Sequence, residues 1–171
     1  MRRVAWYNFF MKRKLLMLLV KIIIVESVIY ILFFQIFGLA RVKTNAMAPN
    51  MNGGDLAFFY HLDNKYEVDD VITYISDNQR HYSRVVAKPG DTVEIKDNQI
   101  YVNGYPSDSV KVFTGELSGN DVVKYPYRLE SNEVFVVNDN RDERFDSRAL
   151  GAMKIEDIDG KVISIIRTRS I

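Results

Sequence analysis

The chain has 171 residues, of which 47 % are hydrophobic and 26 % are charged, so it can form a packed domain of ordinary size. Its net charge of +1 argues against a nucleic-acid-binding protein, which would usually be clearly basic. It has no cysteine, which excludes disulfides, thiolate metal sites and a cysteine nucleophile. With two histidines, His61 and His81, a multi-histidine metal centre is also excluded, and we expect neither a metal nor a cofactor.

The first 40 residues differ sharply from the rest. They contain six basic residues and one acidic residue, whereas the remainder has a net charge of −4. Residues 15–39 are almost entirely apolar and are long enough to span a membrane as a helix. The basic residues that precede them place residues 1–14 in the cytoplasm, so residues 40–171 are predicted to form an extracytoplasmic domain at the cell membrane.

Lys21 and Glu26 lie inside the apolar run, with Gln35 near its end. One interpretation is that Glu26 and Gln35 face a partner helix; the other is that the anchor is poorly optimised. A cleaved signal peptide is a further alternative, because Gly38-Leu39-Ala40 resembles a cleavage site, but the apolar run is too long for a typical signal peptide.

The body reads as mainly β. Short β-rich runs alternate with turn signals, and residues 94–101 read as a hairpin around Asp97-Asn98. This pattern predicts a largely antiparallel sheet or barrel, with one short helical turn within Leu150–Ile158 and a long excursion over Ser107–Tyr127. The predicted strands are Leu56–Tyr60, Val71–Ile75, His81–Ala87, Thr92–Ile95, Gln99–Val102, Glu133–Val137 and Lys161–Arg167.

Three segments are candidates for a site: residues 45–55, 84–91 and 138–148. Taken singly, the first is a loop that would place Met47 and Met51 near the bilayer, and the second is a common turn type. The third is either a solvated charged loop or a buried ion-pair network that joins Asp146 and Arg148 to Arg84. Both histidines read as structural or solvent-exposed, so the residues give little support to a Ser-His-Asp triad.

Together and in this order, behind an N-terminal anchor, the three segments resemble the motifs of type I signal peptidases. The motif Ser-Met-x-Pro-Thr stands here as residues 46–50, followed by Gly54-Asp55. The second motif, Lys-Arg-Val-x-Gly-x-Pro-Gly-Asp, corresponds to residues 83–91. The third motif has two parts: Gly-Asp-Asn-Arg corresponds to residues 138–141, and Ser-x-Asp-Ser-Arg corresponds to residues 144–148. The resemblance implies a signal-peptidase-like antiparallel β-domain behind one transmembrane helix.

This chain differs from these motifs at the positions that are catalytic in the family. That family uses a serine nucleophile, a lysine base with a lowered pKa and a second serine that orients the lysine. The corresponding positions here are Ala46, Ser83 and Arg144, none of which can perform its role. A rescue by Ser83 as nucleophile and Lys88 as base would need a bulge, since residues five apart on a strand point to opposite faces.

The remaining motif residues imply a site that is kept for its shape. We expect Gly90, Asp91, Asp146, Ser147 and Arg148 to support the fold, and Met47, Pro49, Ser83 and Arg84 to line a groove for an extended peptide.

The resemblance is greatest to the signal-peptidase-like pilus-assembly factors of Gram-positive bacteria. It implies a non-catalytic chaperone or scaffold for pilin subunits or a class C-type sortase, with the membrane as a further partner and no nucleic acid. Two alternatives remain open: an active membrane serine endopeptidase with a non-standard dyad, and a structural partner that acts through its transmembrane helix.

Overall fold

A computed structural model describes residues 2–107 and 122–168. The chain divides into two units, Met1–Phe37 and Gly38–Ile171, which we describe separately. The first unit is essentially one helix, α1 (Arg2–Ile36), whose segment Met11–Ile36 is long and apolar enough to cross a membrane. Helix α1 ends at Ile36, and strand β1 (Phe37–Arg41) follows at once, although the sequence predicted helix as far as residue 39.

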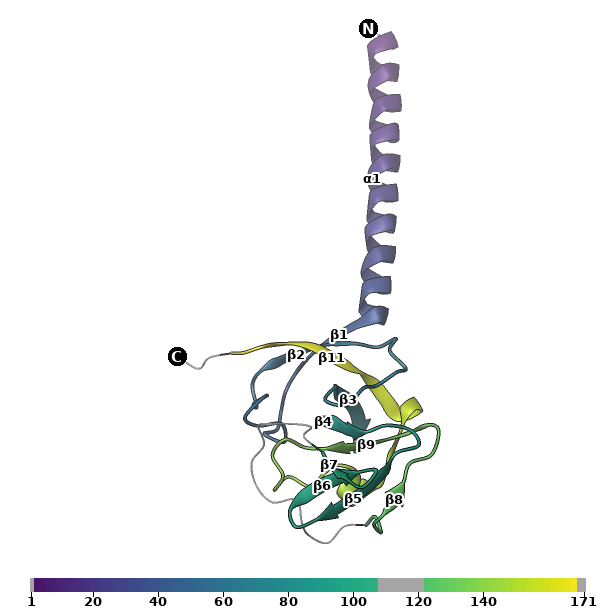
Figure 1. Cartoon of the computed structure of the whole chain (residues 1–171). Helices are drawn as coiled ribbons and strands as arrows, with labels where there is room; N and C mark the ends of the chain where they lie inside the picture. The colour runs from purple at the N-terminus through teal and green to yellow at the C-terminus, as the bar shows by residue number, and fades with distance from the viewer. Residues whose placement is uncertain (1, 108–121, 169–171) are drawn as a thin grey trace. The chain divides into compact units, whose positions relative to one another are not determined.

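The second unit contains two antiparallel sheets (Figure 1). The seven-stranded sheet has the order β1-β2-β11-β3-β4-β9-β10, and the four-stranded sheet has the order β7-β6-β5-β8. The further strands are β2 (Leu56–Tyr60), β3 (Val71–Ser76), β4 (Gln79–Ala87), β5 (Thr92–Lys96), β6 (Gln99–Val102), β7 (Tyr105–Pro106), β8 (Tyr127–Arg128), β9 (Glu133–Val137), β10 (Met153–Lys154) and β11 (Ile158–Ile166).

The mainly β prediction is confirmed, and each of the seven predicted strands is present. The predicted 94–101 hairpin pairs β5 with β6, and Asp97 and Asn98 both have positive φ, as a two-residue hairpin turn requires. The sequence missed β1, which was assigned to the apolar helix, and the two-residue strands β7, β8 and β10, which are too short to show a period.

The predicted helical turn corresponds to a 3₁₀ turn at Ile155–Asp157, and a short helix, α2 (Ser147–Leu150), precedes it. Most of the predicted excursion, residues 108–121, lies outside the described residues.

Strands β4 and β9 lie next to each other inside the larger sheet, and both contribute buried side chains to each of its two faces. On β9, Phe135 and Val137 join one buried cluster with β5 and β6, whereas Val134 and Val136 join another with β3. This alternation is the two-residue period of a strand that is buried on both sides. A register shift between Val85 and Ala87 allows Val86 and Ala87 to face the same cluster. The interior of the domain is therefore organised around the two strands that lead into the candidate site.

Gly160 marks a close approach between β11 and β2. A Cβ atom at this position would lie 2.7 Å from the backbone oxygen of Tyr60, which cannot move without disturbing the sheet. We expect Gly160→Ala to destabilise the domain by about 1–3 kcal/mol, the usual effect of overpacking. Urea unfolding of the full chain in detergent, followed by near-ultraviolet circular dichroism, measures this as a lower midpoint.

Ser164→Ala, at an exposed position of the same strand, is the matched control and should leave the midpoint within experimental scatter. Equal midpoints for the two variants would contradict the close approach.

Candidate functional site

The candidate nucleophile position lies in the loop between β1 and β2. Ala46 is half-buried, and its backbone oxygen accepts a hydrogen bond of 2.9 Å from the Asn140 amide, which ties this loop to the one after β9. Its neighbour Met47 and the nearby Met51 are both buried in a cluster with Val42, Ala57 and Tyr82. Both side chains therefore pack inside the domain, and the nearness of this loop to the bilayer stays a prediction.

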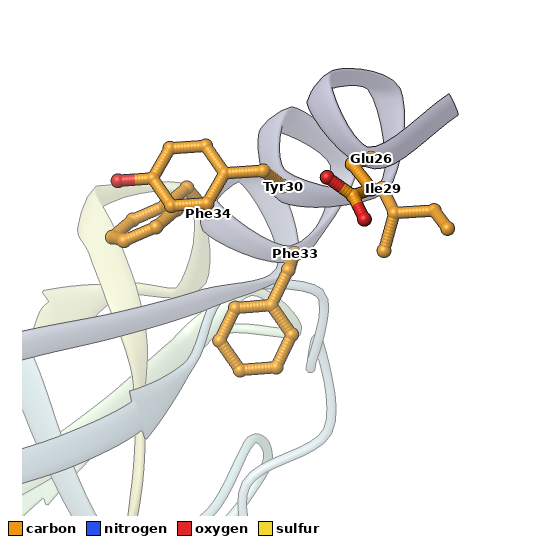
Figure 2. Close-up of a pocket in the computed structure, with 5 residues that line it drawn as sticks. All are labelled: Glu26, Ile29, Tyr30, Phe33 and Phe34. Atoms are coloured by element: carbon orange, nitrogen blue, oxygen red, sulfur yellow. The ribbon is translucent and has the colours of Figure 1, made fainter. Parts of the chain in front are cut away.

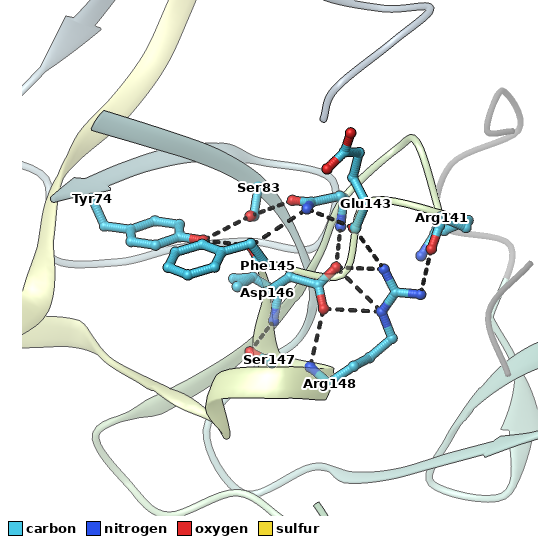
Figure 3. A network of polar contacts seen from close by, with 10 residues as sticks. Tyr74, Ser83, Arg141, Glu143, Phe145, Asp146, Ser147 and Arg148 are labelled. Carbon is cyan, nitrogen blue, oxygen red and sulfur yellow. Dashed lines mark hydrogen bonds and ion pairs between the residues drawn. The ribbon is translucent and has the colours of Figure 1, made fainter. Parts of the chain in front are cut away.

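Ser83, at the position where the resemblance places a lysine base, belongs to a buried hydrogen-bond network (Figure 3). Ser83, on β4, is fully buried and donates a hydrogen bond of 2.6 Å to Asn138 Oδ1. Asn138, just after β9, is also buried and uses its Nδ2 to donate to the Glu143 carbonyl at 2.9 Å. The serine proton is thus directed at an amide oxygen, which cannot serve as a base.

Tyr74 closes the other side of this network. Its hydroxyl donates to the Phe145 carbonyl at 3.0 Å and lies 3.3 Å from Ser83 Oγ. Burial is the main reason that the pKa of Tyr74 is raised, to about 12, so this hydroxyl stays neutral near physiological pH. His81 stacks between Tyr74 and Phe145, at centroid distances of 5.5 Å and 4.3 Å, which supports the prediction that it is structural.

The third degenerate position, Arg144, lies in the loop between β9 and α2. It is half-buried, and its carbonyl accepts a hydrogen bond of 2.9 Å from the Asp146 amide. A guanidinium group is permanently charged, so Arg144 cannot accept the hydrogen bond by which a hydroxyl would orient a lysine.

Two separate ion pairs hold the loops around the site. Arg84 forms a two-pronged interaction with Asp139, with Nε to Oδ1 at 2.9 Å and Nη2 to Oδ2 at 2.6 Å. The Asn50 amide also donates to Asp139 Oδ2, at 2.8 Å, which connects the loop of Ala46 to this pair. Burial alone would lower the pKa of Arg84, but the hydrogen bonds and the charge of Asp139 outweigh it and raise the pKa.

The second ion pair joins Asp146 to Arg148, and both side chains are completely buried. Their closest contact is 2.7 Å, and Arg148 also donates to the carbonyls of Arg141 and Glu143. The predicted buried pair is therefore present, but the prediction that Arg84 joins it was wrong, because Arg84 binds Asp139 instead. Burial, followed by the nearby charge of Arg148, lowers the pKa of Arg141 to about 10.

Asp146 and Ser147 also start helix α2. The Asp146 side chain caps the helix by accepting from the Arg148 amide, and its Oδ2 accepts from the Asn138 amide at 2.9 Å. Ser147 Oγ accepts from the Val136 amide at 3.0 Å and so attaches the helix to β9. These contacts fit the structural role expected of Asp146, Ser147 and Arg148.

Lys88 is not positioned as a substitute base. It follows the end of β4, and its ammonium group lies 2.6 Å from Glu67 Oε2. The hydrogen bond and the negative charge of Glu67 raise the pKa of Lys88, whereas a lysine base needs a lowered one. In the next turn, Gly90 has φ +86°, and Asp91 Oδ2 accepts from the Lys88 amide at 2.9 Å, so this turn is structural.

The expected groove residues differ in their access to solvent. Met47 and Ser83 are fully buried, Arg84 is partly buried and Pro49 is exposed. Sequence reasoning did not identify Tyr74, Asn138 or Asn50 as members of the site. Asn138 could have been identified as a departure from the motif, because it stands where the motif quoted above has glycine. Its contact with Ser83, 55 residues earlier in the chain, is visible only in the structure.

Comparisons with known proteins show the family to which the chain belongs. The sequence model described as "Signal peptidase, peptidase S26" matches residues 13–167. The chain is 29 % identical over 155 residues to a protein named "Inactive signal peptidase IA" from Staphylococcus aureus (strain COL), with 81 % of this chain and 85 % of that protein covered. It is 31 % identical over 137 residues to "Signal peptidase I" of Bacillus caldolyticus, covering 71 % and 74 %.

Among solved structures, a signal peptidase I from Enterococcus faecalis V583 matches with a TM-score of 0.45 and 26 % identity, covering 58 % of this chain and 97 % of that one. The family match spans most of the chain, including all three motif segments, and this chain therefore belongs to the signal peptidase, peptidase S26 family.

Proposed function

We propose that this chain is a non-catalytic signal peptidase homologue, anchored in the cell membrane, that holds an extended polypeptide next to Ala46 instead of cutting it. The observation that carries the proposal is the buried hydrogen bond from Ser83 to Asn138 at the position of the base. Ala46 has no atom that could attack a carbonyl, and Ser83 has no base to accept its proton. A relative named as an inactive signal peptidase supports the same conclusion.

The surroundings of Ala46 suit the binding of an extended chain. The loop of residues 45–50 is fixed from two directions, by the Asn140–Ala46 hydrogen bond and by the Asn50–Asp139 hydrogen bond. Ala46 and Ala48 are half-buried and Pro49 is exposed, so a peptide would contact these small side chains. The side chain of Met47 points into the domain and packs against its interior. A peptide added beside such a rigid loop gains affinity mainly through its own backbone hydrogen bonds.

The proposed location follows from the first 40 residues. Their excess of basic charge precedes the apolar segment of α1, which favours a cytoplasmic N-terminus and an extracytoplasmic β-domain. In this position the domain would meet polypeptides as they leave the membrane. We propose that these are pilin subunits, or a class C-type sortase that joins them, so that the chain acts as a chaperone or scaffold in pilus assembly. The resemblance of residues 45–50 to pilus-assembly factors supports this partner.

The catalytic part of the proposal predicts the outcome of restoring the lost groups. We expect neither the natural chain nor Ala46→Ser to cleave a preprotein, because a serine at position 46 would still lack a base. Cleavage should require Ala46→Ser together with Ser83→Lys and Arg144→Ser, with Asn138→Gly added to make room for the longer side chain. The measurement is cleavage of a signal-peptide-bearing preprotein by full-length chain in detergent, with thermal unfolding as the check that each variant is folded.

The rival function, an active endopeptidase, predicts cleavage by the natural chain that disappears in Ser83→Ala. That result would overturn the proposal.

The binding part predicts which proteins contact position 46. A photo-crosslinking amino acid placed there in the full chain, in native membranes, should capture a pilin or a sortase. The same amino acid at Ile75, an exposed position on β3, is the control and should not capture them. Capture of preproteins with trimmed ends, equal capture at both positions, or no capture by folded chain would each contradict the proposed role.

A further inference from the structure

Helix α1 carries two opposite charges inside its apolar segment. Lys21 and Glu26 are the only charged residues between Leu15 and Ala40. Over the ranges that the structure describes, neither forms an ion pair. Charged side chains at membrane depth are unfavourable unless they pair with one another or reach the interface. Lys21 and Glu26 are therefore each stabilised in the membrane only by an oppositely charged group or by reaching the interface.

The two charges cannot neutralise each other on one helix. Residues pair along a helix surface when they are three or four positions apart, whereas Lys21 and Glu26 are five apart. At about 100° per residue, the two side chains point roughly 140° away from each other. The nearby Ser27 hydroxyl does not help, because it donates to the Ile23 carbonyl of its own helix at 2.7 Å. Each charge needs a group from outside the helix.

A second copy of this chain supplies both partners when it lies parallel to the first. Lys21 and Glu26 flank a continuous apolar seam with the alternating three- and four-residue spacing of a helix dimer. In a parallel dimer, a residue on one side of such a seam faces the residue five positions later on the other helix. The residues of the seam are Leu15, Leu18, Ile22, Val25, Ile29 and Leu32.

The surface of α1 is hollowed beside Glu26, on the flank of this seam. The pocket is open and apolar, and its lining residues are Glu26, Ile29, Tyr30, Phe33 and Phe34 (Figure 2). Ile29 belongs to the seam, and Phe33 lies on the same side as Glu26, two turns further along the helix. The hollow offers apolar walls to the long methylene stem of a lysine whose ammonium group reaches the carboxylate.

We propose that α1 forms a parallel dimer with a second copy of itself, joined by two equivalent Lys21–Glu26 ion pairs across the membrane-embedded seam. In an antiparallel pair the same flank of each helix would face its counterpart, so Lys21 would not meet Glu26, and the identical basic tails would lie on opposite sides of the membrane. The inference rests on the proposed membrane anchoring and is independent of what the β-domain binds. Extraction of the membranes at alkaline pH tests the anchoring separately.

The absence of cysteine makes disulfide crosslinking a clean test. Val25→Cys places a thiol on the seam, and Val20→Cys places one on the opposite side of the helix, so the two variants are matched in residue type. After oxidation of full-length chain in membranes, we expect about tenfold more covalent dimer from Val25→Cys than from Val20→Cys. In the Val25→Cys chain, Lys21→Glu or Glu26→Lys alone should lower the dimer by about the same factor, because like charges then face each other.

The most direct test is whether exchanging the two charges restores the dimer. Combining Lys21→Glu with Glu26→Lys in one chain should restore the dimer, and so should co-expression of the two single variants, since one helix then carries two carboxylates and its partner two ammonium groups. Equal crosslinking at positions 20 and 25, or no rescue by the exchange of charges, would overturn the proposal. A crosslinked band with a different protein in place of the dimer would also overturn it and would identify another helix as the occupant.

Discussion

The buried ion pair between Asp146 and Arg148 holds together the segment on which the site depends. Neither side chain is exposed to solvent, and each charge is compensated by the other and by backbone groups. Removing one partner of such a pair typically destabilises a protein by about 3–5 kcal/mol, because an uncompensated charge stays buried. Through this pair, residues 138–148 form a closed loop whose ends lie against β9. The neighbouring Arg84–Asp139 pair then fixes the loop of Ala46 to it through Asn50.

This frame is compatible with the proposal that the position of Ser83 has become structural without loss of the fold. Ser83 in place of a lysine would leave space and an unmatched hydroxyl on β4, and Asn138 supplies both volume and an acceptor. Asn138 in turn satisfies its amide nitrogen with the Glu143 carbonyl, so the polar groups of this network are matched inside the domain. A lysine base would have to be held uncharged in this interior, which is unfavourable to folding, whereas the neutral pair requires no such adjustment. The loop around Ala46 is thus held over a network in which Ser83 and Asn138 are neutral and hydrogen-bonded.

Much of the fold could be predicted from the sequence, because the strands of the β-domain show their period directly. The alternation in Glu133–Val137 and the Asp97-Asn98 turn are local signals, and the structure contains both as expected. The strand Phe37–Arg41 could not be predicted, because its sequence continues the apolar run of the helix. Only its pairing in a sheet distinguishes it from the helix. The contacts around Ser83 could be predicted only in part, because Tyr74, Asn138 and Asn50 were not identified. Arg84 pairs with Asp139 and not with Asp146, and the spacing of these residues along the chain does not indicate which of the two lies closer.

The central claim is that Ser83 and Asn138 form one structural unit where the family has its base, and a double-mutant cycle on the free energy of unfolding tests it most directly. Ser83→Ala, Asn138→Ala and the double variant would be compared with the natural chain by urea unfolding in detergent. The account predicts that the two single effects are not additive, with a coupling of about 0.5–1.5 kcal/mol from the buried hydrogen bond. Additive effects, with no coupling between the two positions, would contradict it.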